Sequence, residues 1–121
     1  QHVCLAEFDL EALLAQVPAV HRYRPLSRFP EVTRDLAVVV NEGLAAEQVR
    51  ETIAKAGGKL LYRIELFDVY RGKQIPVGKK SLAYALTYRA MDRTLTDSEV
   101  NRLQKRIQNT LHKELGATLR V

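Results

Sequence analysis

The chain has 121 residues, 46% of them hydrophobic and 27% charged, a composition typical of one folded domain rather than of a disordered chain. Its one cysteine, Cys4, excludes an intrachain disulfide, as expected in a reducing compartment such as the cytoplasm. No apolar run approaches the roughly 18 residues that a membrane-spanning helix needs, and residues 1–20 show no signal peptide. The first residue, Gln1, indicates a piece of a longer chain.

Positive charge is concentrated in the second half of the sequence. Residues 1–70 carry 8 Lys and Arg against 10 Asp and Glu, a net charge of −2, whereas residues 71–121 carry 11 against 4, a net charge of +7. This asymmetry predicts an electropositive face, and polyanions such as nucleic acids are the usual partners of such a face. A basic face that only meets solvent is the alternative.

The first thirty residues divide into short pieces. Residues 3–8 predict a strand, and residues 10–16 predict a short helix that Pro18 ends. Residues 22–30 contain two prolines and no periodicity, which predicts an extended connector because residues before proline avoid the helical region.

From residue 34 onward the pattern is sharper. Residues 34–40 are β-branched and half alternating, which predicts a strand, and residues 41–43 have turn chemistry. Residues 45–56 predict an amphipathic helix that the glycines at 57–58 end. Residues 60–70 predict a second strand.

Residues 71–78 predict a loop, and residues 81–89 a third strand with strict alternation of large and small side chains. We expect the large residues to face a helix layer and the others to form the opposite, open face of the sheet. The large set is Leu82, Tyr84, Leu86 and Tyr88, and the open set is Ser81, Ala83, Ala85, Thr87 and Arg89. A flat surface of small side chains beside Lys and Arg would let an RNA backbone or base lie close.

The last helix has the clearest start signal in the sequence. Residues 96–99, Thr-Asp-Ser-Glu, form a capping box, and an apolar stripe at spacings of three and four then runs as far as Leu115. Gly116 ends this helix, and residues 117–121 predict a final strand. The order from residue 34 is therefore β-α-β-β-α-β, a ferredoxin-like α+β fold with a four-stranded antiparallel sheet and two helices on one face.

The sequence contains no complete catalytic or metal-binding motif. Gly72 and Gly78 are separated by five residues instead of the four of a phosphate-binding loop, and a strand follows where a helix should begin. The three histidines share no ligand spacing with Cys4 or with one another, so no metal site is predicted. No nucleophile, base and oxyanion donor come together, so no catalytic residue is predicted.

Five blocks in order resemble the ferredoxin-fold anticodon-binding domain at the C-terminus of the bacterial phenylalanyl-tRNA synthetase beta chain. They are residues 23–30 (YRPLSRFP), 34–40 (RDLAVVV), 65–72 (ELFDVYRG), 78–84 (GKKSLAY) and 92–97 (DRTLTD), within a resemblance that covers residues 23–120. On this basis residues 1–22 are predicted to be the tail of a preceding domain and a linker, and residues 23–121 the anticodon-binding domain.

The resemblance implies a parent assembly of two alpha and two beta chains that joins phenylalanine to its tRNA with ATP and magnesium, with catalysis on the alpha chain. This domain would bind the tRNA anticodon stem-loop and would need no cofactor of its own. Its partners would be tRNA, the rest of the beta chain and the alpha chain, in the cytoplasm and without a membrane.

Candidate RNA contacts are cations in loops or at strand ends near the presumed open face, together with residues on that face. The predicted phosphate contacts are Arg28, Arg34, Arg71, Lys79, Lys80, Arg89 and Arg93, and the predicted base-proximal residues are Tyr70, Ser81 and Ala83. Phe67 is a further aromatic candidate, whose face depends on whether residues 66–70 contain a bulge. Asp35 and Asp68 are expected to orient arginines or cap turns.

Replacing both Lys79 and Lys80 by alanine is expected to weaken tRNA binding and to leave folding intact.

Three other functions are compatible with the same fold. An amino-acid-sensing regulatory domain would bind its ligand at a turn such as residues 41–43. An acylphosphatase-like enzyme would need an arginine in the first loop, where Glu42 stands instead. A protein-assembly domain would dock its basic face on a protein and show no preference for RNA, and fold alone does not decide among these readings.

Overall fold

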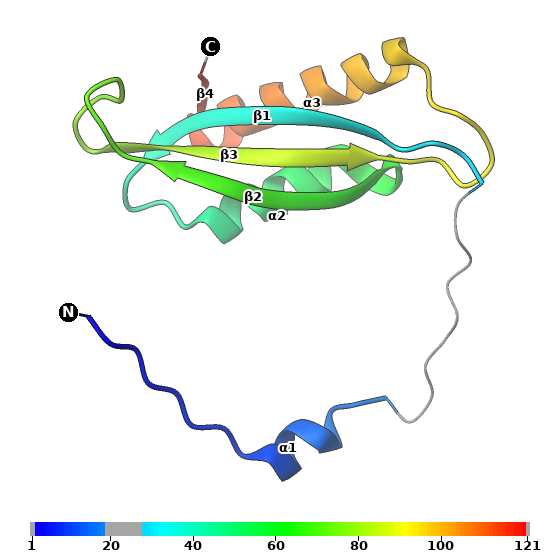
Figure 1. Ribbon diagram of the computed structural model, residues 1–121. Helices are drawn as coiled ribbons and strands as arrows, with labels where there is room; N and C mark the ends of the chain where they lie inside the picture. Colours follow the sequence, from blue (N-terminus) through cyan, green and yellow to red (C-terminus); the bar gives the residue numbers. More distant parts are fainter. Residues whose placement is uncertain (1, 19–27, 121) are drawn as a thin grey trace.

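The computed structural model describes residues 2–18 and 28–120 (Figure 1). In chain order the elements are α1 (Leu10–Ala15), β1 (Val32–Asn41), α2 (Ala46–Gly57), a 3-10 turn (Gly58–Leu60), β2 (Leu61–Tyr70), β3 (Lys79–Tyr88), α3 (Asp97–Leu115) and β4 (Thr118–Leu119).

The four strands form one antiparallel sheet in the order β2-β3-β1-β4. Helices α2 and α3 lie side by side behind this sheet, and no helix of the described residues covers its other face (Figure 1). The predicted ferredoxin-like fold is therefore confirmed.

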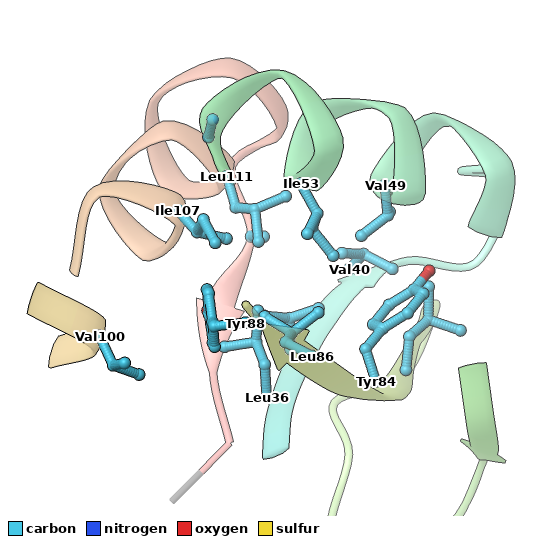
Figure 2. Packing of buried hydrophobic residues seen from close by; sticks show 14 of the residues in the cluster. Leu36, Val40, Val49, Ile53, Tyr84, Leu86, Tyr88, Val100, Ile107 and Leu111 are labelled. Carbon is cyan, nitrogen blue, oxygen red and sulfur yellow. The ribbon is translucent and has the colours of Figure 1, made fainter. Parts of the chain in front are cut away.

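The core lies between the sheet and the two helices. The side chains of Leu82, Tyr84, Leu86 and Tyr88 are all at most 1% exposed, as the alternation in β3 predicted. Figure 2 shows Tyr84, Leu86 and Tyr88 pointing towards the helix layer, which contributes Val49, Ile53, Ile107 and Leu111 to the core.

Both core tyrosines have partners for their hydroxyl groups. The Tyr84 hydroxyl donates to the carbonyl of Ala46 at 2.9 Å, and the Tyr88 hydroxyl donates to Gln104 Oε1 at 2.9 Å. Burial raises the pKa of each phenol to about 12, because the charged phenolate would lie in an apolar environment. Polar atoms of the core are thereby paired, as buried polar groups must be.

Helix α3 begins at the predicted capping box. The Thr96 hydroxyl accepts from the backbone N–H of Glu99 at 3.3 Å, and the Glu99 carboxylate accepts from the backbone N–H of Thr96 at 3.0 Å. That second bond is the main reason why the pKa of Glu99 lies below its usual value. The helix ends where Gly116 adopts a left-handed conformation, with φ of 61°, which glycine adopts without steric cost.

Two predictions near the ends of the chain need correction. Residues 3–8 form no strand and are exposed, because no described strand pairs with them and a lone strand leaves its backbone groups without partners. The final strand is only Thr118–Leu119, since its pairing with β1 covers two positions. The short N-terminal helix is present as α1, whereas the predicted domain boundary at residues 22–23 lies outside the described residues.

Candidate nucleic-acid interface

The open face of the sheet is built from small side chains at its centre. In the register of β1 and β3, Asp35 lies opposite Ala85 and Ala37 lies opposite Ala83. Because alternate residues of a strand point to opposite faces, these four share the face that the helices leave uncovered. The predicted surface of small side chains is therefore present in the middle of β3.

A bulge in β2 sets the position of the most exposed aromatic residue on this face. Leu66 pairs with Tyr84 and Asp68 pairs with Ala83, so Phe67 is an extra residue between two regular pairs. The Phe67 side chain is 59% exposed. It lines a shallow hollow of about 650 Å³ together with Asp35, Glu65, Leu66 and Ala85. An aromatic ring is thus held beside two carboxylates on the open face.

Two arginine–tyrosine stacks occupy the ends of the same face. The Arg89 guanidinium lies 3.5 Å from the centre of the Tyr62 ring and donates to Glu31 at 2.9 Å. At the other end, the Arg120 guanidinium lies 4.7 Å from the centre of the Tyr70 ring and donates to Gln74 at 3.3 Å. Since both of these rings already carry cations, the ring of Phe67 is the one left available between them among the described residues of the open face.

The predicted base-proximal residues are less accessible than the alternation suggested. Ser81 is only 2% exposed, while Tyr70 and Ala83 are half-buried. The register places Tyr70 beside Ser81, and Arg120 reaches over the Tyr70 ring. Ser81 is therefore on the expected face but is covered, and this corrects its choice as a base contact.

Two of the predicted phosphate contacts lie on the helix side of the sheet. Arg34 is opposite the core residue Leu86 and donates to Asp97 at 2.9 Å. Lys80 is opposite Val40, is only 8% exposed, and donates from Nζ to the carbonyl of Glu42 at 2.8 Å. Both placements near the open face are thereby corrected, and Lys80, which is buried, serves the fold.

The other predicted cations differ in how firmly they are held. Arg71 pairs with Glu42 at 2.8 Å and Arg93 pairs with Glu99 at 2.7 Å, with both arginine side chains about half exposed. Exposed pairs of this kind contribute only about 0–1 kcal/mol, so a phosphate can replace the carboxylate. Arg89 is held more firmly, because its side chain is only 14% exposed. Arg28 and Lys79 form no ion pair with any residue in the described part of the chain.

Sequence reasoning missed the two carboxylates of the hollow. The sequence predicts that Asp35 orients an arginine or caps a turn, and it does not single out Glu65. Glu65 lies 3.6 Å from Arg63, and both Glu65 and Asp35 are exposed at the hollow. A carboxylate only accepts hydrogen bonds, so this site suits a ligand that presents N–H donors above an aromatic ring. The signal was the cross-strand register, which places Asp35, Ala85 and Glu65 in one row.

The turn at residues 41–43 is occupied by contacts within the chain. The backbone N–H of Glu42 donates to the carbonyl of Gly78 at 2.9 Å, and its carboxylate pairs with Arg71. These contacts do not favour a ligand-sensing turn. Among residues 2–18 and 28–120, no cluster of three metal-ligating side chains is present. No helix in these two ranges is long and apolar enough to span a bilayer.

The chain is an α+β protein with a ferredoxin-like sheet, and the open face of that sheet carries an exposed aromatic ring. Residues 27–120 match the model of the ferredoxin-fold anticodon binding domain, and the chain belongs to that family. The predicted resemblance is thereby confirmed.

Relatives of the chain carry the name phenylalanine–tRNA ligase beta subunit. The protein of Moorella thermoacetica is 55% identical over 97% of this chain, that of Clostridium acetobutylicum 47% over 96%, and that of Syntrophotalea carbinolica 44% over 99%. In each case the match covers 15% of the relative, so the chain spans a small part of the length of these proteins.

Proposed function

We propose that this chain is the anticodon-binding domain of a phenylalanine–tRNA ligase beta subunit and that it binds the tRNA anticodon loop on the open face of its sheet. The family match and the relatives' shared name support this assignment. The observation that carries the choice of face is the hollow at Phe67, because unpaired RNA bases stack on exposed aromatic rings of open sheets.

Phe67 would stack an unpaired base, while Glu65 and Asp35 would accept hydrogen bonds from its edge. Guanine suits such acceptors, since its Watson–Crick edge carries N–H donors at N1 and N2. The small side chains of Ala85 and Ala37 leave the neighbouring surface flat. A base with only acceptors at the same positions would instead face carboxylate oxygens, which is unfavourable.

Phosphates of the loop would meet cations that are free or only loosely paired. Arg28 and Lys79 are the first choices, and Arg71 and Arg93 would exchange a carboxylate for a phosphate. Arg89 would act mainly by holding Tyr62 in place at the end of the face. Tyr70 and Ala83 would border the bound base rather than stack on it.

Aminoacylation would take place elsewhere in the parent assembly. The domain would hold tRNA without catalysing a reaction, and ATP and magnesium would act at a site outside this chain. Its partners would be phenylalanine tRNA, the rest of the beta chain and an alpha chain, in the cytoplasm. Residues 1–22 would belong to the tail of a preceding domain and a linker, and residues 23–121 to the anticodon-binding domain.

Substitution of Phe67 tests the proposed face. Loss of one base–aromatic stack costs about 1–3 kcal/mol, so Phe67→Ala should weaken binding of the phenylalanine anticodon stem-loop by roughly 5- to 150-fold. Met91→Ala is the matched control, because Met91 is an equally exposed apolar residue, also at 59%, in the loop after β3. Fluorescence anisotropy of labelled stem-loop RNA measures both. Equal affinities of Phe67→Ala and Met91→Ala would remove the open face from the proposal.

A further inference from the structure

A run of cations that form no ion pair within the described part of the chain lies on the helix layer, on the opposite side of the domain from Phe67. Along the outer face of α3, a shallow hollow is lined by Arg102, Lys105, Arg106, Asn109, Thr110, Lys113 and Glu114. We refer to Arg102, Lys105 and Lys113 as the α3 stripe. Their spacings of three and eight residues keep them on one side of a helix with 3.6 residues per turn.

The charges of the α3 stripe are not neutralised by carboxylates in the described part of the chain. All three side chains are exposed, and none forms an ion pair with a residue of the described part of the chain. Glu99 lies three residues before Arg102, but its carboxylate is taken up by Arg93 and Thr96. The stripe therefore differs from the open face, where most arginines already hold a carboxylate or a ring.

Helix stability alone would disfavour this arrangement. Arg102 lies three residues before Lys105 and four before Arg106, and like charges at these spacings destabilise a helix. Attraction to the helix dipole explains a cation in the last turn, such as Lys113, but not Arg102 or Lys105. Arg106 does have a structural role, because it donates to the carbonyls of Ala56 at 2.7 Å and Gly57 at 3.2 Å.

The contact of Arg106 also brings the end of α2 beside the stripe. Lys55 and Lys59 flank Ala56 and Gly57 in the chain, and both are exposed. The positive charge thus extends from α3 across to the neighbouring helix end. Glu114 is the one carboxylate among the residues that line the hollow.

The chemistry of this surface favours a nucleic-acid backbone over a protein. The cores of protein interfaces are rich in aromatic and apolar residues and poor in charge, whereas no apolar side chain lines this hollow. Lys, Arg, Asn and Thr are the side chains that bind phosphates. With no aromatic ring on the surface, bases would not be read.

We infer that the α3 stripe is a second RNA-binding surface, which contacts the phosphate backbone of paired RNA without sequence preference. The inference extends the proposed function, because it gives the same domain a second RNA contact on its other side. Helices α2 and α3 cover one face of the sheet and leave the other open (Figure 1). The hollow at Phe67 lies on the open face and the α3 stripe on the outer side of α3, so the two contacts lie back to back.

Binding of a blunt RNA duplex without a loop tests the α3 stripe in the full chain. The variant Arg102→Gln/Lys105→Gln/Lys113→Gln should make the log–log salt slope for the duplex shallower by about 2 to 3, close to one per lost phosphate contact. The control Arg50→Gln/Arg63→Gln/Lys73→Gln removes the same charge elsewhere and should leave the slope nearly unchanged. Equal effects of the two variants would show a response to net charge alone and would overturn the inference.

Two further arms separate the possible outcomes. Polyglutamate should compete with the duplex poorly at equal charge concentration, and competition as strong as that of RNA would overturn the inference in favour of an acidic protein partner. Phe67→Ala should keep the duplex slope of the unaltered chain. If the chain failed to prefer the matching anticodon loop, the proposed function would fail, whereas the duplex slope would still report on the α3 stripe.

Discussion

Lys79 and Lys80 are neighbours in the sequence but lie on opposite sides of the sheet. Lys79 is the first residue of β3, and Lys80 is buried and donates from its ammonium to the carbonyl of Glu42. Long side chains of this type bury their methylene stem while the charged head finds a polar partner. The two lysines therefore have different roles, and replacing both at once would mix RNA binding with stability.

Single substitutions separate the two lysines. Lys80→Ala removes a buried side chain and its charge-assisted hydrogen bond to the Glu42 carbonyl, and should lower the free energy of unfolding by about 1–3 kcal/mol. Lys79 is only partly exposed, but its side chain makes no ion pair in the described part of the chain, so Lys79→Ala should change the free energy of unfolding by less than about 0.5 kcal/mol. Urea denaturation followed by circular dichroism measures both. A loss for Lys79→Ala as large as that for Lys80→Ala would contradict the assignment.

The sequence predicted which kinds of residue are functional or buried better than it predicted which side of the sheet each one occupies. The alternation in β3 identified its buried tyrosines and leucines because the strand is regular throughout. In β2 the extra residue at Phe67 shifts the alternation, and no local pattern announces a bulge. Arg34 and Lys80 were misplaced for a related reason, since their faces follow from pairing with Leu86 and Val40.

Features that neighbouring residues in the sequence encode agree well with their predictions. The capping box, the glycine ends of α2 and α3, and the loop at residues 71–78 all follow from neighbours in the chain. The strand expected at residues 3–8 is absent, because strand formation depends on a partner that the local sequence does not contain.

The two buried tyrosines of β3 should make the free energy of unfolding fall at alkaline pH. The folded pKa of Tyr84 and of Tyr88 is about 12, against about 10 in an unfolded chain. Below pH 10 both states hold the protons and the stabilisation is complete. As the pH rises from 10 towards 12 the unfolded chain loses these protons first, so the folded state is destabilised.

Phenylalanine substitutions isolate this effect. Tyr84→Phe should cost about 1 kcal/mol at neutral pH, because the bond to the Ala46 carbonyl is lost. It should also reduce the fall in stability between pH 10 and 12, and Tyr84→Phe/Tyr88→Phe should reduce that fall further. Urea unfolding at pH 7, 10 and 11.5 measures the change. A double variant with the pH dependence of the original chain would show that other groups are responsible.

In the whole molecule, the excess charge of the second half of the sequence is divided between two faces. Arg71, Lys79, Arg89 and Arg93 lie in loops or at strand ends beside the sheet, while the α3 stripe lies on the helices. The sequence indicated that a basic face exists but could not tell which cations are already neutralised. That depends on carboxylates such as Glu31 and Glu42, which are distant from their partners in the chain.

The fold itself was predictable because its core depends on repeated, redundant signals. Helices α2 and α3 each have an apolar stripe, and the large residues of β3 alternate along the strand, so an error at one position does not change the architecture. The candidate site has no such redundancy. It consists of a few side chains from β1, β2 and β3 that only the register brings together.

A salt-series titration of the full chain tests the central claim most directly. The partners are the phenylalanine anticodon stem-loop and a control stem-loop with an exchanged anticodon. We predict tighter binding of the matching loop, with a log–log salt slope of roughly −2 to −4 from a few phosphate contacts. Equal binding of both loops, or no binding even at low salt, would contradict anticodon recognition by this domain.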